Sequence, residues 1–354
     1  MMKKRRTSYA LQIVTAAMVA FMFFGLLTGC AQQAPPPTAA PPAATAAPAD
    51  TADEPEQAPD NQVFEIGIIS LMEHPALDAA GHGFKAALLD EGISFNYDYQ
   101  NAQGDSATLS TIAQRFVNNN VDMILAIATG SAQAAASETD TIPIIGTAIT
   151  DYEVARLVDS NESPGGNVTG ASDMMPVAAQ VALITEFVPD AQVIGIVYSS
   201  NEPNSVIQAQ IAQEAAEALG LSVEVGTVTT TADVQQVTMS VANRVDAIWI
   251  PTDNTYANAM PLVAQISLDT GVPVFAADTS MTMTGGIATL GISYFDLGWQ
   301  SGLKAAQVLR GEAVPAEMPI QWAEYFSYTV NGEMAELLGI NVPERLTNFI
   351  RFPE

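Results

Sequence analysis

Short apolar runs alternate with helix-like stretches along most of the chain, and this alternation constrains the fold more than any other feature. The run Val63–Leu71 precedes a helix-like stretch that begins near Pro75, and the same order recurs through Phe275. Wholly apolar runs separated by helical crossovers are typical of parallel strands that are covered on both faces. The sequence therefore predicts an α/β fold with doubly wound parallel sheets.

The series of apolar runs starts again after Pro176, which indicates two similar lobes. Three matches in the same order, together with Pro75 and Pro203, have nearly constant offsets of 124 to 130 residues. Two generic α/β lobes that converged independently would give similar matches, so that alternative stays open. The matching segments are Ile66–Ile68 with Ile194–Ile196, Val121–Ile124 with Val245–Ile248, and Ile142–Ile145 with Val272–Phe275.

The ends of these apolar runs supply the candidate ligand site. In open parallel sheets, ligands bind beyond the carboxyl ends of the strands, where helix N-termini present free N–H groups. Six such ends carry small hydroxyl, amide and carboxylate side chains and no cation. The candidate ligand-binding residues are Glu73, His74, Thr129, Gly130, Ser131, Ala148, Thr150, Asp151, Asn201, Asp253, Asn254 and Asp278.

Two of these ends have complementary chemistry. Thr129 to Ser131 open a helix after a buried run, so they either cap that helix or bind an anion through its first amides. A single carboxylate fits this place better than a phosphate, because no Lys or Arg lies at any of the six ends. Asp253, the counterpart of Thr129, either caps its own helix or binds an ammonium group. Together the two ends suit an amino-acid zwitterion.

The N-terminal region predicts export and a lipid anchor. Four cations at Lys3–Arg6 precede the nearly uncharged run Tyr9–Leu27, as in a secretory signal. The only cysteine, Cys30, follows Leu27-Thr28-Gly29, and this pattern resembles a lipobox, in which the cysteine is acylated after cleavage. An uncleaved membrane anchor is the alternative. We expect a signal peptide at 1–29 and a Pro/Ala-rich linker at 30–62.

Composition and missing motifs argue against several other functions. The net charge of −27 makes a nucleic-acid partner unfavourable. The chain has two histidines, no G-x-S-x-G elbow and no phosphate-binding P-loop, so we expect no enzyme, metal or cofactor. The segment Gly81–Ala86 matches G-x-G-x-x-A, but it lies inside a helix-like stretch instead of at a strand–helix turn.

Several longer segments resemble the tryptophan/tyrosine-type family of ABC-transporter substrate-binding proteins. They include EHPALDAA, YQNAQGD, ATGSAQAAA, SPGGNVTGASDMMPVAAQ and PTDNT, and the resemblance runs from about residue 63 to 340. It implies a type I periplasmic-binding fold, an amino-acid ligand that is most often aromatic, and delivery to an ABC permease with a cytoplasmic ATPase. The protein would then work outside the cytoplasm, lipid-anchored in the periplasm or on the cell surface.

The resemblance also implies roles for individual residues. Ser131, the neighbouring amides and Thr150 would hold the α-carboxylate, and Asp253 would take the ammonium group. Glu73, Asn201 and Asp278 would line the cleft. The aromatic residues nearest to the site are Tyr152, Tyr256 and Phe275, and each either stacks on a ligand ring or packs in the core. A branched-chain amino acid or a nucleoside remains an alternative ligand, and a sensor for a membrane signalling partner remains an alternative role.

The expected division of the chain follows from three hinge crossings, near 173–176, 281–286 and 319–328. The N-lobe would comprise 63–174 and 281–318. The C-lobe would comprise 175–280 and 319–354.

Overall fold

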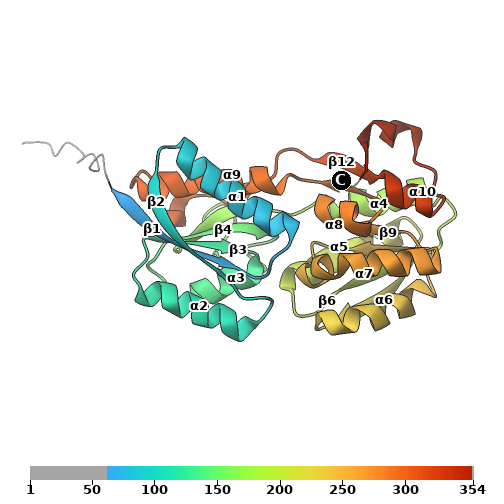
Figure 1. Ribbon diagram of the computed structural model, residues 1–354, viewed down its shortest axis with the longest axis horizontal. Coiled ribbons are helices and arrows are strands. Elements are labelled where there is room, and N and C mark those ends of the chain that lie inside the picture. The colour runs from blue at the N-terminus through green and yellow to red at the C-terminus, as the bar shows by residue number, and fades with distance from the viewer. Residues whose placement is uncertain (1–61, 353–354) are drawn as a thin grey trace, which may run out of the picture. The chain divides into compact units, whose positions relative to one another are not determined.

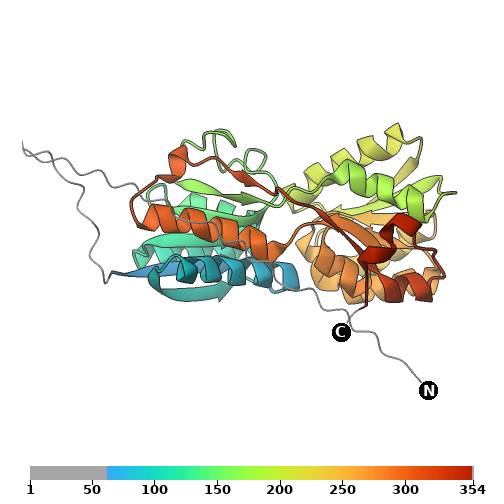
Figure 2. The same cartoon turned by 90° about the horizontal axis from the view of Figure 1, so that it is seen from above.

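The computed structural model describes residues 62–352, which form two α/β lobes (Figure 1, Figure 2). The predicted signal peptide, Cys30 and the linker up to residue 61 lie outside the described residues. Within 62–352, no helix has the length and apolar character needed to cross a bilayer.

The N-lobe is built on a six-stranded parallel sheet in the order β11-β5-β4-β3-β1-β2. Helices α1 and α9 cover one face of this sheet, and α2 and α3 cover the other (Figure 1). Its elements are β1 (Val63–Ser70), α1 (Pro75–Asp90), β2 (Ser94–Asn101), α2 (Ser106–Asn118), β3 (Met123–Ile127), α3 (Thr129–Glu138), β4 (Ile144–Ile149), β5 (Val168–Ser172), α9 (Tyr294–Leu309) and β11 (Gln321–Trp322).

The C-lobe contains a four-stranded parallel sheet, β7-β6-β8-β9, and a small sheet, β10-β12-β13, in which β10 and β12 are antiparallel. Its elements are α4 (Val177–Phe187), β6 (Val193–Ser199), α5 (Pro203–Ala218), β7 (Ser222–Val228), α6 (Val234–Ala242), β8 (Ala247–Ile250), α7 (Asn254–Thr270), β9 (Val274–Ala276), α8 (Thr279–Gly285), β10 (Ala288–Gly291), β12 (Ser327–Asn331), α10 (Gly332–Leu337) and β13 (Ile350–Arg351).

The strand registers confirm the predicted repeat. Strand order β2-β1-β3-β4 in the N-lobe matches β7-β6-β8-β9 in the C-lobe. Ile66 pairs with Met123 in the first sheet, and their counterparts Ile194 and Ala247 pair in the second. The shared glycine of the repeat has a steric reason. A Cβ on Gly67 would lie 2.6 Å from the Phe116 ring on α2. In the second lobe, a side chain of α6 lies equally close to the position of a Cβ on the matching glycine.

Glycines also explain the close packing of α1 against α9. A Cβ on Gly83 would lie 1.9 Å from the carbonyl oxygen of Phe295, and one on Gly298 would lie 1.9 Å from that of Ala80. The two backbones can approach this closely only because these positions lack side chains. The glycines of the G-x-G-x-x-A segment therefore lie within a helix, and Gly83 serves helix packing.

Two of the expected lobe boundaries differ from the structure. The segment 281–286, where we expected the second crossing, ends α8 and packs on the C-lobe strands β9, β10 and β12. The chain returns to the N-lobe between β10 and α9, after Gly291. Similarly, β11 was expected in the C-lobe but pairs with β5 of the N-lobe. Both segments are too short to show a clear period in the sequence.

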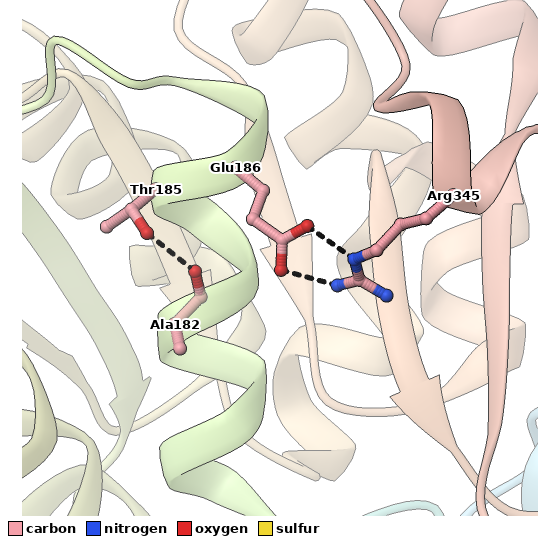
Figure 3. Close-up of polar contacts among 4 residues, drawn as sticks. All are labelled: Ala182, Thr185, Glu186 and Arg345. Atoms are coloured by element: carbon pink, nitrogen blue, oxygen red, sulfur yellow. Dashed lines mark hydrogen bonds and ion pairs between the residues drawn. The ribbon is translucent and has the colours of Figure 1, made fainter.

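The C-terminal segment is attached to the C-lobe through Arg345. Its guanidinium forms a two-bond ion pair with Glu186 near the end of α4, with Nε to Oε2 at 2.7 Å (Figure 3). The same group lies 4.7 Å from the ring centroid of Tyr328 on β12. In the neighbouring turn of α4, the Thr185 hydroxyl donates to the carbonyl of Ala182 at 2.8 Å (Figure 3).

Candidate functional site

A cleft of about 400 Å³ lies between the two lobes, at the carboxyl ends of their strands. Its N-lobe wall consists of the loop after β1 and the first turns of α2 and α3. Its C-lobe wall consists of the loop after β6 and the starts of α5 and α7. None of the residues that line it is a lysine or an arginine, as the sequence indicated.

The N-terminus of α3 has free hydrogen-bond donors. Gly130 lines the cleft, and among the described residues no acceptor is recorded for the amide of Thr129 or Gly130. The Ser131 hydroxyl is fully buried and has no partner within the described residues. The preceding Ala128 has a φ of 80°, a costly conformation for a residue with a side chain that is typical of ligand sites. This helix start can bind an anion.

The N-terminus of α7, on the opposite wall, is already occupied by carboxylates of the chain. Glu202 accepts bonds from the amides of Asn254 and Thr255 at 3.0 and 2.9 Å. Asp253 caps the helix by accepting from the amide of Tyr256 at 2.8 Å, and its other oxygen accepts from the amide of Ser199 at 2.6 Å. Burial, and then the negative charge of Glu202, raise the pKa of Asp253.

The C-lobe wall is therefore negative where the N-lobe wall offers donors. Glu202 lines the cleft, whereas Asp253 is 1% exposed and lies behind it. Ser199 also lines the cleft, and its buried hydroxyl has no partner among residues 62–352. An ammonium group at this wall would meet the charge of Glu202 and the free oxygen of Ser199.

Between the two polar walls lies an apolar patch. Leu71 and Leu109 approach the position of a Gly130 Cβ to within 3.6 and 3.5 Å, and Met72 contacts the neighbouring turn at Gly104. Pro203 contributes from the C-lobe wall. The patch is aliphatic, and a methionine thioether is a favourable partner for an aromatic ring.

A second, smaller group of buried polar residues lies towards the hinge. Asp173 accepts from the Thr150 hydroxyl at 2.8 Å and from the Tyr294 hydroxyl at 2.9 Å. Burial raises the pKa of Asp173 to about 6, and the two hydrogen bonds oppose this rise. The Tyr294 bond connects the first crossing to the start of α9, at the second crossing. This network connects segments of the hinge, and the Thr150 hydroxyl is used as a donor within it.

The lobes also meet directly at the inner end of the cleft. The Nε2 atom of His74, just before α1, lies 3.1 Å from Oδ1 of Asn254, the first residue of α7. Closer to the hinge, the hydroxyls of Thr150 and Thr252 lie 3.4 Å apart.

Apart from Thr150, which belongs to the hinge network, the predicted residues divide into three groups. Gly130 and Asn201 line the cleft, and Thr129 and Ser131 belong to the same helix start. The second group surrounds a small inner cavity of about 10 Å³ next to the cleft. The members of this second group are His74, Ala148, Asp253, Asn254 and Asp278.

The third group lies away from the cleft. Glu73 is exposed and lines a separate groove between α1 and β2, because the helix begins two residues later and turns it outwards. Asp151 caps a turn by accepting from the amides of Glu153 and Val154, both at 3.0 Å. The three aromatic residues nearest to the site are at most 1% exposed and belong to the hydrophobic cores, so the alternative of ordinary packing holds for all of them; they are Tyr152, Tyr256 and Phe275.

Glu202 and the apolar patch were not among the residues predicted from the sequence. A signal for Glu202 was present, because it precedes Pro203 just as His74 precedes Pro75 in the repeat. Leu109 lies within helix α2 and does not directly follow a strand, so the residues at the strand ends did not include it.

Comparison with known proteins decides the family. The family model described as ABC transporter substrate binding protein matches residues 65–349. The chain belongs to this family. Substrate-binding proteins of ABC transporters work outside the cytoplasm, and the two parallel-sheet lobes have the type I periplasmic-binding fold.

Three relatives are informative. A tyrosine-binding protein from Clostridioides difficile is 33% identical over 331 residues, which cover 92% of each chain. An ABC domain from Streptococcus pneumoniae in complex with L-Trp is 35% identical, with a TM-score of 0.79, over 83% of this chain and 100% of that one. A ligand-free, open substrate-binding protein with adhesive properties from Clostridium difficile is 37% identical, with a TM-score of 0.64, over 82% and 99%.

The two TM-scores differ although the sequence identities are nearly equal. This substrate-binding protein therefore resembles the L-Trp complex more than the open structure in its overall structure.

Proposed function

We propose that this substrate-binding protein captures an aromatic amino acid in the cleft and delivers it to an ABC import permease with a cytoplasmic ATPase. The observation that carries the proposal is the opposite character of two helix N-termini that face one cleft. The start of α3 has free donors, and the start of α7 is filled by Glu202 and Asp253. A zwitterion bound across the cleft matches both.

The ligand would lie with its carboxylate on the N-lobe and its ammonium group on the C-lobe. Thr129, Gly130 and Ser131 supply donors to the carboxylate, and Glu202 with Ser199 receives the ammonium group. Hydrogen bonds to charged groups contribute roughly 1.5–3 kcal/mol each. The earlier assignment of the ammonium to Asp253 is replaced, because Asp253 is 1% exposed and lies behind the cleft, whereas Glu202 lines it.

The side chain of the ligand would occupy the apolar patch of Leu71, Met72, Leu109 and Pro203. An aromatic ring is favoured because relatives of similar length bind tyrosine and L-Trp. Burial of a ring contributes about 25 cal/mol per Å² of apolar surface. Such a site also suits capture without chemical turnover, so we propose no catalytic role.

The N-terminal sequence completes the proposal. Acylation of Cys30 would hold the protein at the membrane, and the Pro/Ala-rich linker would keep the lobes beside the permease.

Titration calorimetry with three ligands tests the site. L-Trp carries both charged groups, tryptamine lacks the carboxylate, and indole-3-propionate lacks the ammonium group. We expect L-Trp to bind at least roughly tenfold more tightly than either analogue. In Glu202→Gln, the preference for L-Trp over indole-3-propionate should shrink, while the preference over tryptamine should persist. Equal affinities for all three ligands in the wild-type protein would refute the zwitterion site.

A further inference from the structure

The amide of Asn254 connects the two lobes. Its Nδ2 atom donates to Oε2 of Glu202 at 2.6 Å within the C-lobe. Its Oδ1 atom lies 3.1 Å from Nε2 of His74 in the N-lobe. All three residues are at most 9% exposed. A buried chain of hydrogen bonds therefore runs from the N-lobe to the carboxylate that faces the cleft.

The repeat gives this chain of bonds an internal symmetry. His74 precedes Pro75 at the start of α1, and Glu202 precedes Pro203 at the start of α5, at the same offset of 128 residues that relates the first strands. The helices that follow the matching strands β1 and β6 are thus each preceded by a residue that binds the same side-chain amide.

The network also fixes the tautomer of His74. Because Nδ2 of Asn254 donates to Glu202, its Oδ1 must accept, so Nε2 of His74 carries the hydrogen. The other ring nitrogen, Nδ1, is buried and has no partner among residues 62–352. A buried unpaired nitrogen is unfavourable for the fold, so packing alone does not account for a histidine at this position.

We propose that His74 is a latch: it holds the N-lobe closed over the ligand and, through Asn254, keeps Glu202 in place for the ammonium group. His74 is then a positioning residue and not a ligand contact. The proposal rests on the proposed function for its effect on the ligand, but its effect on the lobes does not need a ligand.

The histidine content of the chain provides a matched control. His82, the only other histidine, lies on α1 and is exposed, away from the cleft. The test compares wild type, His74→Ala, His74→Gln and His82→Ala, with L-Trp as the ligand. Stopped-flow mixing gives the association and dissociation rate constants.

We expect His74→Ala to raise the dissociation rate constant by about two- to tenfold, the effect of losing one hydrogen bond. The association rate constant should change less. His74→Gln should recover part of the effect, because its amide can donate to Asn254, and His82→Ala should match wild type. In a double-mutant cycle, His74→Ala should have little further effect in an Asn254→Ala background.

A second measurement separates the latch from the ligand assignment. Small-angle scattering without ligand should show a larger radius of gyration for His74→Ala than for wild type and His82→Ala. If wild type binds no amino acid but this difference is present, the proposed function fails and the latch stands. If L-Trp binds, and His74→Ala equals wild type in both dissociation rate and radius of gyration, the latch is refuted.

Discussion

At the scale of single residues, Ser131 most directly connects sequence to function. Its hydroxyl is buried at the start of α3 without a partner among the described residues. A helix cap would have used that hydroxyl on a neighbouring amide. The serine was a candidate site residue from the strand end that it follows, but its unpaired state required the structure.

Replacing Ser131 with alanine should weaken L-Trp binding by roughly ten- to a hundredfold, because a hydrogen bond to a charged carboxylate is lost. Tryptamine, which has no carboxylate, should bind equally to both proteins. Titration calorimetry measures both affinities. Ser137→Ala is the control, since Ser137 lies exposed on the same helix and bonds only to the carbonyl of Ala134. Equal losses for L-Trp and tryptamine would contradict the carboxylate role.

Asp173 predicts a pH effect on stability. Its pKa is raised by burial from 3.8 to about 6, so the folded protein binds this proton more tightly than the unfolded chain. The resulting stabilisation is complete below about pH 4 and is lost as the pH rises to about 6. The loss amounts to about 3 kcal/mol.

Urea unfolding of wild type and Asp173→Asn between pH 4 and 7 measures this effect. The free energy of unfolding of wild type, relative to the variant, should fall between pH 4 and 6 and then level off. A difference that is constant with pH would show that the pKa of Asp173 is not raised.

At the scale of elements, the repeat explains most of what the sequence could predict. Strand pairs such as Ile66 with Met123 and Ile194 with Ala247 follow the offsets that the sequence contains. Local patterns failed where long-range packing decides the outcome. The helix α8 and the two-residue strand β11 are defined by tertiary contacts, and no hydrophobic period marks them.

The close helix–strand packing that both lobes share predicts that a side chain added at Gly195 destabilises the fold. An added Cβ would lie 2.5 Å from Val241 on α6 and 3.3 Å from Ile248 on β8. Gly195→Ala should therefore lower the free energy of unfolding by about 1–3 kcal/mol, as overpacking does. Gly166→Ala is the control, because a Cβ there would meet nothing within 4 Å. Equal thermal midpoints for the two variants would contradict the proposed packing of α6.

At the scale of the whole molecule, the site depends on both lobes at once. In the proposed site, the donors to the carboxylate come from α3 and the negative charge comes from the loop before α5, so neither lobe alone would bind a zwitterion at both ends. The sequence predicted the two walls from the strand ends. It did not predict the aliphatic patch or the interlobe bond of His74, because both require the relative positions of α1, α2 and α7.

The most direct test of this account is the thermal midpoint of the protein against all twenty L-amino acids and a set of nucleosides, after bound ligand is removed by unfolding and refolding. A ligand that binds the folded state raises the midpoint, and the increase grows with the logarithm of the ligand concentration relative to its Kd. We predict the largest increases with tryptophan, tyrosine or phenylalanine and none with nucleosides. An increase with nucleosides alone would contradict the zwitterion site, while leaving the fold and the family unchanged.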